Sequence, residues 1–299
     1  MSNPDKITIG VVNFNVRNGD KEHNLTKIEK ISIEAAKKNV DLILFPETCL
    51  MGYDYFINEN ILMEEKIKHS EKLDGESVNR IKKIAQSYEI YIIFGMSEKD
   101  DNGNLYNSAI ITEPNGTVGA YRKIHPFDKE NTWCLKGTTP FMIDTKWGLI
   151  SVGICYDTYQ FPELMRYYVA KGSRLYLNLT ALAEEINLEG SKDAFLKSYT
   201  TMLEYGVLAN SIYIASSNLC GYDHFNYFGG GSMVIGPKET EFKENNLKVY
   251  CGDDRNVNEG LFFAEIDLSL SKRDIFQKNA ITDTPDFRPD LYKQLYSSL

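Results

Sequence analysis

The 299-residue sequence has little of what secreted, membrane-spanning or disulfide-built proteins need. It contains no run of 18 apolar residues, so we expect no transmembrane helix and no membrane partner. Its first residues lack the charged-then-apolar pattern of a signal peptide. Its five cysteines include no C-x-x-C pair, and an odd number in so long a chain is a poor disulfide framework. These absences predict a reduced, cytoplasmic protein.

Positive charge and histidine are also scarce. The 33 basic residues are outnumbered by 42 acidic ones, and a net charge of −9 argues against a nucleic-acid partner or an anionic membrane surface. The four histidines lack the spacing of metal ligands, so we expect no metal. The glycines at 229–231 match neither a P-loop nor a dinucleotide fingerprint.

No Pro-, Gly- or Ser-rich linker and no internal repeat divides the chain, so we expect a single domain over 1–299 with a polar tail from about 270. Strands and helices alternate at first, give way to hairpins at Asn102-Gly103 and Asn115-Gly116, and then alternate again. This order favours an α/β protein with a mixed sheet, more a layered sandwich than a purely parallel doubly wound fold. We expect strands at 7–13, 40–45, 91–96, 105–112, 118–123, 149–154, 173–179, 211–217, 229–235 and 261–266, helices at 24–38 (with Asn24 as N-cap), 77–88, 161–170 and 192–210, and an irregular loop over the site at 50–67.

The stretch from Gly148 to Leu164 suggests a reactive site. An apolar, β-rich run ends at Ile154, and a helix with Pro162 in its first turn follows. Cys155 lies between them, on a strand-to-helix turn whose backbone N–H groups could polarise a bound carbonyl. The alternative is that Cys155 is a buried small hydrophobic residue, as free cysteines often are.

Two other predicted strands also lead into a chemically useful side chain. Glu47 follows Asp-Leu-Ile-Leu-Phe-Pro, and Lys123 ends Gly-Ala-Tyr-Arg-Lys. Because ligands bind at the carboxyl ends of strands in open α/β sheets, these residues and Cys155 could converge on one cleft. A thiol nucleophile, a carboxylate base and a fixed cation suit acyl transfer. Taken singly, Glu47 could be a solvated loop acid and Lys123 a charge at a strand edge.

The same three motifs resemble those of the nitrilase superfamily of carbon–nitrogen hydrolases. The likeness rests on Phe-Pro-Glu at Glu47, Tyr-Arg-Lys-Ile-His at Lys123, and Gly-Ile-Cys-Tyr-Asp-x-x-x-Phe-Pro-Glu-Leu at Cys155. It extends over nearly the whole chain, including the Gly-rich 228–235 and the segment 203–207. The resemblance implies a four-layer α-β-β-α sandwich with mixed sheets, which often pairs into homodimers or larger homo-oligomers.

The resemblance also implies roles for individual residues. Cys155 would be the nucleophile, Glu47 the general base and acid, and Lys123 the oxyanion stabiliser, helped by the backbone N–H of Tyr156. Glu130 stands seven residues before Gly137, where many family members carry a further glutamate, and would orient Lys123 or the substrate. Glu47 would take the thiol proton, Cys155 would form a thioester, and water would hydrolyse it, with no metal or organic cofactor.

The substrate follows less directly from the sequence. Family members that cleave nitriles usually show Cys-Trp-Glu, whereas Cys155-Tyr156-Asp157 is similar to the amide-cleaving branches. Amidases for dicarboxylic ω-amides often have arginine where Gln160 stands. We therefore expect a small-molecule amide as substrate, with an N-carbamoyl amine or a nitrile as alternatives. The expected pocket wall consists of Tyr53, Tyr55, Phe56, Tyr156, Asn178, Leu179 and Thr180.

Two readings outside this mechanism remain open. A Cys155–His125 hydrolase on another fold would lose activity on replacement of His125 and keep it on replacement of Lys123. A catalytically silent relative would act as a binding or interaction protein, although such a protein has no need of the intact Glu–Lys–Cys set.

Overall fold

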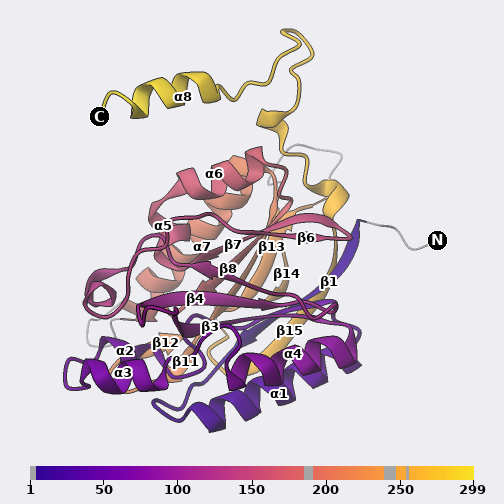
Figure 1. Ribbon diagram of the computed structural model, residues 1–299. Coiled ribbons are helices and arrows are strands. Elements are labelled where there is room, and N and C mark those ends of the chain that lie inside the picture. The colour runs from indigo at the N-terminus through magenta and orange to yellow at the C-terminus, as the bar shows by residue number, and fades with distance from the viewer. Residues whose placement is uncertain (1–4, 185–190, 239–246, 254–255) are drawn as a thin grey trace.

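The computed structural model describes residues 5–184, 191–238, 247–253 and 256–299. Two six-stranded sheets pack face to face in the middle of the molecule, and helices cover their outer faces (Figure 1). The layers follow the order α-β-β-α, which confirms the predicted four-layer sandwich. None of the helices in the described ranges has the length and hydropathy required to cross a lipid bilayer.

Both sheets have parallel strands at their centre and antiparallel strands toward their edges. The central parallel strands are β1, β2 and β3 in one sheet and β7, β8 and β10 in the other. In order, the first sheet contains β15 (Gly260–Asp267), β1 (Lys6–Asn13), β2 (Leu42–Leu44), β3 (Tyr91–Lys99), β4 (Leu105–Thr112) and β5 (Val118–Arg122). The second contains β14 (Leu247–Gly252), β13 (Met233–Pro237), β10 (Tyr213–Asn218), β8 (Leu175–Thr180), β7 (Gly148–Ile154) and β6 (Met142–Thr145).

The inner strands β1 to β4 of the first sheet are buried on both faces over most of their length, which explains why they read as largely apolar runs. In β1, Ile9 and Val11 belong to the core between the sheets, while Val12 belongs to a second core shared with the helices. Helices α1 (Lys21–Lys37) and α4 (Glu76–Tyr88) lie over this sheet, and α6 (Pro162–Ala170) and α7 (Ser191–Asn210) cover the other (Figure 1). The catalytic candidates therefore sit on strand ends fixed by packing from both sides.

Three local predictions were wrong. Helix α1 begins at Lys21, because the Asp20 carboxylate accepts the backbone N–H of His23 and so caps the helix, whereas Asn24 is buried inside it. The stretch 50–67 is not wholly irregular, since it contains α2 (Tyr53–Ile57) and part of α3 (Met63–His69).

The expected strand at 229–235 is split into β12 (Tyr227–Gly229) and β13, because Gly230 and Gly231 have φ values of +68° and +75°. Strand β12 pairs instead with β11 (Cys220–Tyr222) and β9 (Ala183–Glu184) in a small third sheet. This sheet, β6 and β14 were not predicted.

The C-terminal segment after the last sheet strand buries few residues. It contains three short helices, η2 (Leu268–Leu270), η3 (Asp274–Phe276) and α8 (Pro289–Tyr296). Neither η3 nor α8 has a buried residue. Figure 1 shows α8 at the end of an extended stretch that leads away from the sheets.

Candidate active site

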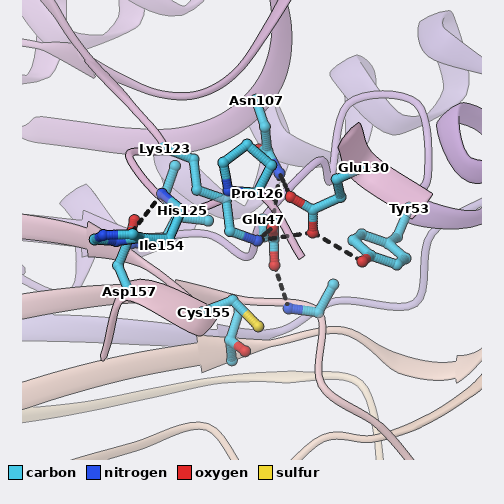
Figure 2. Close-up of polar contacts among 12 residues, drawn as sticks. Glu47, Tyr53, Asn107, Lys123, His125, Pro126, Glu130, Ile154, Cys155 and Asp157 are labelled. Carbon is cyan, nitrogen blue, oxygen red and sulfur yellow. Dashed lines mark hydrogen bonds and ion pairs between the residues drawn. The ribbon is translucent and has the colours of Figure 1, made fainter. Parts of the chain in front are cut away.

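Three of the predicted site residues meet at the ends of β2, β5 and β7 (Figure 2). Glu47 lies three residues beyond β2, Lys123 directly follows β5, and Cys155 directly follows β7. The Lys123 Nζ atom is 2.7 Å from Glu47 Oε1, and Cys155 is close enough for both charges to act on its thiol. The convergence expected from strand ends is therefore present in the structure.

A sharp turn directs Glu47 into the space between the sheets. Thr48, the next residue, has a φ of +47°, and the turn lies against Gly95 of β3. A Cβ atom on Gly95 would come within 2.3 Å of the Thr48 backbone nitrogen. Only glycine at position 95 allows this approach, so the path of the chain at Glu47 depends on a residue of the neighbouring strand.

Lys123 is bound between two carboxylates. Its Nζ atom lies 2.7 Å from Glu47 Oε1 and 2.7 Å from Glu130 Oε1, and all three side chains are 0 to 1% exposed. Glu130 comes from η1 (Asp128–Thr132), the short 3-10 helix after the Lys123 motif. The structure thus places Glu130 beside Lys123, where the predicted orienting role requires it.

Two neutral side chains complete the hydrogen bonding of the two acids (Figure 2). Asn107 Nδ2 donates to Glu47 Oε1 at 2.7 Å and to Glu130 Oε2 at 3.3 Å. The Tyr53 hydroxyl donates to Glu130 Oε1 at 2.8 Å. Tyr53, expected on the pocket wall, therefore contacts the acid that holds Lys123.

The second oxygen of Glu47 faces the sheet that carries Cys155. Glu47 Oε2 accepts the backbone N–H of Ala181, just beyond β8, at 2.9 Å. Burial raises the pKa of Glu47, and the Lys123 charge opposes this effect only in part. Burial by itself lowers the pKa of Lys123, but Glu47 and Glu130 outweigh it and raise that pKa well above its usual range. Lys123 is thus a permanent cation, while Glu47 is a carboxylate with a raised affinity for a proton.

Cys155 occupies a strained position between β7 and α5 (Tyr156–Gln160). Its φ of +48° and ψ of −101° are rare for a residue with a side chain. Its backbone N–H donates to the Leu179 carbonyl oxygen at 2.8 Å and to Asn178 Oδ1 at 3.1 Å. Burial raises the pKa of the thiol, as does Glu47, while Lys123 and a hydrogen bond from Thr180 lower it. Cys155 is therefore protonated at neutral pH until a base removes its proton.

Asn178 and Thr180, expected on the pocket wall, are fully buried beneath the Cys155 turn. Asn178 Oδ1 accepts the Thr158 hydroxyl at 2.7 Å as well as the Cys155 N–H, and its Nδ2 donates to the hydroxyls of Tyr159 and Ser216. The Tyr159 hydroxyl in turn donates to Thr180 Oγ1 at 3.2 Å. The side-chain amide of Asn178 uses both its oxygen and its nitrogen in hydrogen bonds around the nucleophile's turn, and its place on the pocket wall stays a prediction.

Tyr156 is half-buried, and its ring packs edge-on against Phe127 and Phe161, with centroids 5.0 and 5.2 Å away. Its backbone N–H belongs to the first turn of α5, where amides lack an intrahelical acceptor. That N–H has no acceptor within the helix, and its oxyanion role stays a prediction.

His125 is bound to Asp157 instead of Cys155. Its backbone N–H and its Nδ1 atom lie 3.0 and 2.8 Å from Asp157 Oδ1, and its ring stacks on Phe161 with centroids 3.5 Å apart. Asp157 also accepts the Tyr121 hydroxyl at 2.7 Å. His125 therefore helps to anchor the start of α5, and the Cys–His arrangement is not what the structure shows.

Sequence reasoning missed several groups around the site: Asn107, Thr158, Tyr159, Ser216 and the Ala181 backbone N–H. Asn107 gave only a weak signal, because Ser108 and Thr112 of the same strand are polar too. The others contact the site through tertiary packing that no local pattern reports. In the described ranges, no group of three or more His, Cys, Asp or Glu side chains has the arrangement of a metal site.

The fold matches that of a known amidase from Nesterenkonia sp. AN1. A double mutant of that amidase in complex with acrylamide aligns with a TM-score of 0.74 at 20% sequence identity, covering 99% of this chain and 98% of the amidase. At this identity the likeness establishes the layered α-β-β-α fold alone.

Sequence comparison goes further. The family model for carbon-nitrogen hydrolases matches residues 8–272. A probable nitrilase of Schizosaccharomyces pombe is 30% identical over 297 residues, spanning 98% of this chain and 99% of the relative. The 2-oxoglutaramate amidase of Bacillus subtilis is 29% identical over 294 residues, spanning 96% of this chain and all of the relative. The chain belongs to the carbon-nitrogen hydrolase family, which confirms the resemblance drawn from its motifs.

Proposed function

We propose that this protein is a thiol-dependent amidase that hydrolyses the C–N bond of a small linear amide through a cysteine thioester. One observation carries the proposal: a buried cysteine on a strained turn faces a lysine whose ammonium group is bound between two buried carboxylates. This arrangement supplies a nucleophile, a base and a fixed positive charge within one water-poor site.

The reaction begins when Glu47 accepts the Cys155 thiol proton as Sγ attacks the amide carbon. The raised pKa of Glu47 suits this step, because a base is most effective when its pKa is not far below that of the acid it deprotonates. The carbonyl oxygen becomes an oxyanion, which Lys123 Nζ and the Tyr156 backbone N–H stabilise.

Collapse of the tetrahedral intermediate breaks the C–N bond. Glu47 returns its proton to the departing nitrogen, which leaves as ammonia or an amine, and the acyl group remains on Cys155 as a thioester. Water then attacks the thioester while Glu47 takes one of its protons, and the carboxylic acid leaves as the thiol is restored. Glu130 keeps Lys123 oriented in both halves of the cycle, and the Tyr53 hydroxyl fixes Glu130.

The charges around the site favour an amide with a neutral acyl group. Two carboxylates and one ammonium leave the cluster with an excess of negative charge. A substrate carboxylate would be repelled here. Gln160, where ω-amidases often carry arginine, is exposed. The 2-oxoglutaramate amidase of Bacillus subtilis therefore shares the family with this chain but is not its model for substrate.

Two other substrates and one non-enzyme remain as alternatives. An N-carbamoyl amine presents the same carbonyl–nitrogen bond to Cys155, and Tyr156-Asp157 argues against a nitrile. A silent binding protein could lose any member of the Glu–Lys–Cys set, yet all three are present and Lys123 is bound to Glu47.

Ammonia release across a substrate panel tests the proposal. The panel contains propionamide, glutaramate, an N-carbamoyl amine and propionitrile, each assayed with wild type and with Cys155→Ala. We expect release from propionamide to exceed that from glutaramate at least tenfold, and Cys155→Ala to reduce it by a factor of about 10⁴ or more. Cys251→Ala, which removes a cysteine of the second sheet's edge strand, should leave the rate unchanged. If no panel member releases ammonia and Cys155 does not react with iodoacetamide, the proposal that the protein is an enzyme is wrong and a binding protein is favoured.

We also propose that the protein forms a homo-oligomer through the α6, α7 and α8 region. Tyr205 and Leu208 of α7 and Leu295 of α8 are 52 to 60% exposed, and a cavity of about 940 Å³ lies between α6 and the C-terminal segment. Apolar surface of this kind commonly marks an interface. Light scattering of the intact protein and of a chain ending at residue 270 tests this: a dimer that the truncation dissociates supports it, and a monomeric intact protein rejects it.

The cytoplasmic location also stays a proposal. All five cysteines are free, and the nucleophile must remain a thiol to act. Cell fractionation with an antibody against the protein tests it.

A further inference from the structure

Asn107 belongs to β4, and its backbone connects it to Lys123. The Lys123 N–H donates to the Asn107 carbonyl oxygen at 2.8 Å, which extends the β4–β5 ladder by one step beyond Arg122. Because neighbours across a ladder lie side by side, the Asn107 side chain is placed next to the Lys123 side chain. Asn107 is fully buried.

Its side-chain nitrogen binds both acids of the cluster. The Nδ2 atom donates to Glu47 Oε1 at 2.7 Å and to Glu130 Oε2 at 3.3 Å, while Lys123 contacts the Oε1 atoms of both acids (Figure 2). An amide NH₂ has two donors, and each has one carboxylate. Lys123 and Asn107 therefore form two parallel bridges between the same pair of acids.

The other end of the amide shows what fixes its orientation. Asn107 Oδ1 is buried and has no hydrogen-bond partner among the described residues. Turning the amide over would place this oxygen against two carboxylates, which is worse than leaving it unbonded. The requirements of Glu47 and Glu130, rather than those of Asn107 itself, thus determine how the side chain is held.

We infer that Asn107 is a positioning residue whose amide holds Glu47 and Glu130 at fixed orientations on either side of Lys123. The inference deepens the proposed function and rests on it. The single positive charge of Lys123 balances only one of the two carboxylates. Asn107 donates a hydrogen bond to each acid without adding charge. Glu47 then keeps one oxygen on this bridge and directs the other toward the sheet that carries Cys155.

The loss of the Asn107 amide should change the pH dependence of the reaction. The Asn107 hydrogen bond lowers the pKa of Glu47 and so opposes the larger effect of burial. The titratable groups that influence Glu47 or lie against its two bridges come from separate elements: Lys123, Glu130, Tyr53, Cys134 and Cys155. None of these titratable groups changes when Asn107 is replaced. A shift in the acid limb, the low-pH side of the pH–rate profile, therefore reports the loss of the amide.

The experiment compares Asn107→Leu and Asn107→Asp with wild type. Leucine has nearly the same size and removes the donors together with the unbonded oxygen, whereas aspartate keeps the shape and replaces the donors by a third acid. Ser108→Ala is the matched control, because Ser108 is the next residue of β4 and donates to a different buried acid, Glu98, at 2.7 Å. Two readouts are followed between pH 5 and 9: kcat/KM for propionamide, and the rate at which iodoacetamide alkylates Cys155, measured by mass spectrometry.

We expect the acid limb of both profiles to move upward by about one pH unit in Asn107→Leu, with a larger shift in Asn107→Asp, because a hydrogen bond to a charged group has about that effect. Most of the loss should fall in kcat, and Ser108→Ala should keep the wild-type limb. An unmoved limb in Asn107→Leu would overturn the inference, as would an equal shift in Ser108→Ala.

The alkylation readout separates this inference from the proposed function. It needs no turnover, so a protein inactive on every amide still reports whether Asn107 controls the acids beside Cys155. If wild type turns over propionamide and the acid limb does not move in Asn107→Leu, the amidase proposal is supported and the role of Asn107 is rejected. If wild type is inactive and the alkylation limb moves, the role of Asn107 stands and the proposed substrate falls.

Discussion

Arg122 and Lys123 are neighbours at the end of β5, and each binds a buried glutamate, but they lie on opposite faces of the strand. Arg122 is partly in solvent, with a side chain 36% exposed, and it binds Glu98 through Nε and Nη2 while its guanidinium lies 3.8 Å from the centre of the Tyr106 ring. Lys123 is 0% exposed and is bound between two acids. One step along the chain therefore separates a partly solvated ion pair from a fully buried one.

The difference lies in what surrounds the charges. A rigid two-pronged contact at the surface saturates both partners and stabilises the strand modestly. In the buried cluster two carboxylates share one ammonium, so the cluster keeps an excess of negative charge that favours binding of a proton by Glu47. Pairing by itself does not distinguish the two sites, and we take the excess of buried acid over ammonium beside a thiol as the mark of the proposed active site.

Replacing each cation by methionine should separate the two sites most clearly. Lys123→Met removes the oxyanion donor and leaves two carboxylates in one pocket, so we expect kcat/KM for propionamide to fall about 10³-fold and the free energy of unfolding to fall by about 3 kcal/mol. Arg122→Met should keep kcat/KM within about threefold of wild type, since its contact is partly solvated. Equal losses in the two variants would show that the strand end, and not the buried ammonium, limits activity.

The acids can be compared in the same way. Glu47→Gln should reduce kcat/KM about 10³-fold, because a general base contributes on this order. It should not lower the melting temperature at pH 7, because burial already disfavours the ionised form of Glu47. Glu98→Gln should show the opposite pattern, with activity near wild type and a lower melting temperature, because it breaks the contact with Arg122. Thermal melts and kcat/KM on the same preparations provide the test, and an active Glu47→Gln protein would remove Glu47 as the base.

Tyr53 extends the reactive cluster by one hydrogen bond. Tyr53→Phe removes the donor to Glu130 and should lower kcat/KM about tenfold, the effect of roughly 1.4 kcal/mol for a hydrogen bond to a charged group. Tyr121→Phe is the control, because its hydroxyl binds Asp157, an acid outside the cluster. A larger loss of kcat/KM in Tyr121→Phe would mean that the anchoring of α5, and not the position of Lys123, limits activity.

The sequence made the main features of this comparison predictable. Glu47, Lys123 and Cys155 each follow an apolar run, and runs of that kind form the central strands whose ends meet. The spacing of Glu130 from Gly137, read through the family resemblance, placed a further acid near Lys123. Periodicity and motif order were sufficient here because each signal lies within a few residues of the group it positions.

Other parts of the site could not be predicted, because they depend on contacts between distant segments. Asn107 reaches Glu47 across 60 positions, and Ala181 reaches it across 134. The expectation for Asn178 placed it correctly at a strand end, but the hydrogen bonds of its side chain around the Cys155 turn were not predicted. A strand end indicates where a residue lies, and only packing decides whether its side chain faces the substrate or the core.

A third group of acids has no cation partner in the described part of the chain and gives the smallest of the expected effects. Asp54 Oδ2 accepts the backbone N–H groups of three consecutive residues, His224 to Asn226, and Asp223 Oδ2 accepts the Asp54 N–H at 2.7 Å. Burial raises the pKa of Asp223 from 3.8 to about 6, although the hydrogen bonds from the Asp54 backbone and the Asn18 side chain lower it. The folded state therefore binds a proton here that the unfolded chain releases near pH 4, and the free energy of unfolding decreases as the pH rises from about 4 to 6.

Asp223→Asn cannot ionise and keeps one acceptor oxygen, so it should escape this loss. We expect its melting temperature relative to wild type to increase by on the order of 2 °C between pH 4 and pH 7 and then to stay level. Asp74→Asn, at an exposed acid, should show a constant difference over the same range. A relative melting temperature for Asp223→Asn that falls with pH would mean that the backbone N–H groups stabilise the ionised carboxylate after all. Backbone N–H groups would then stabilise a buried carboxylate as well as a cation does. The excess of acid over ammonium at Lys123 would no longer distinguish the proposed active site.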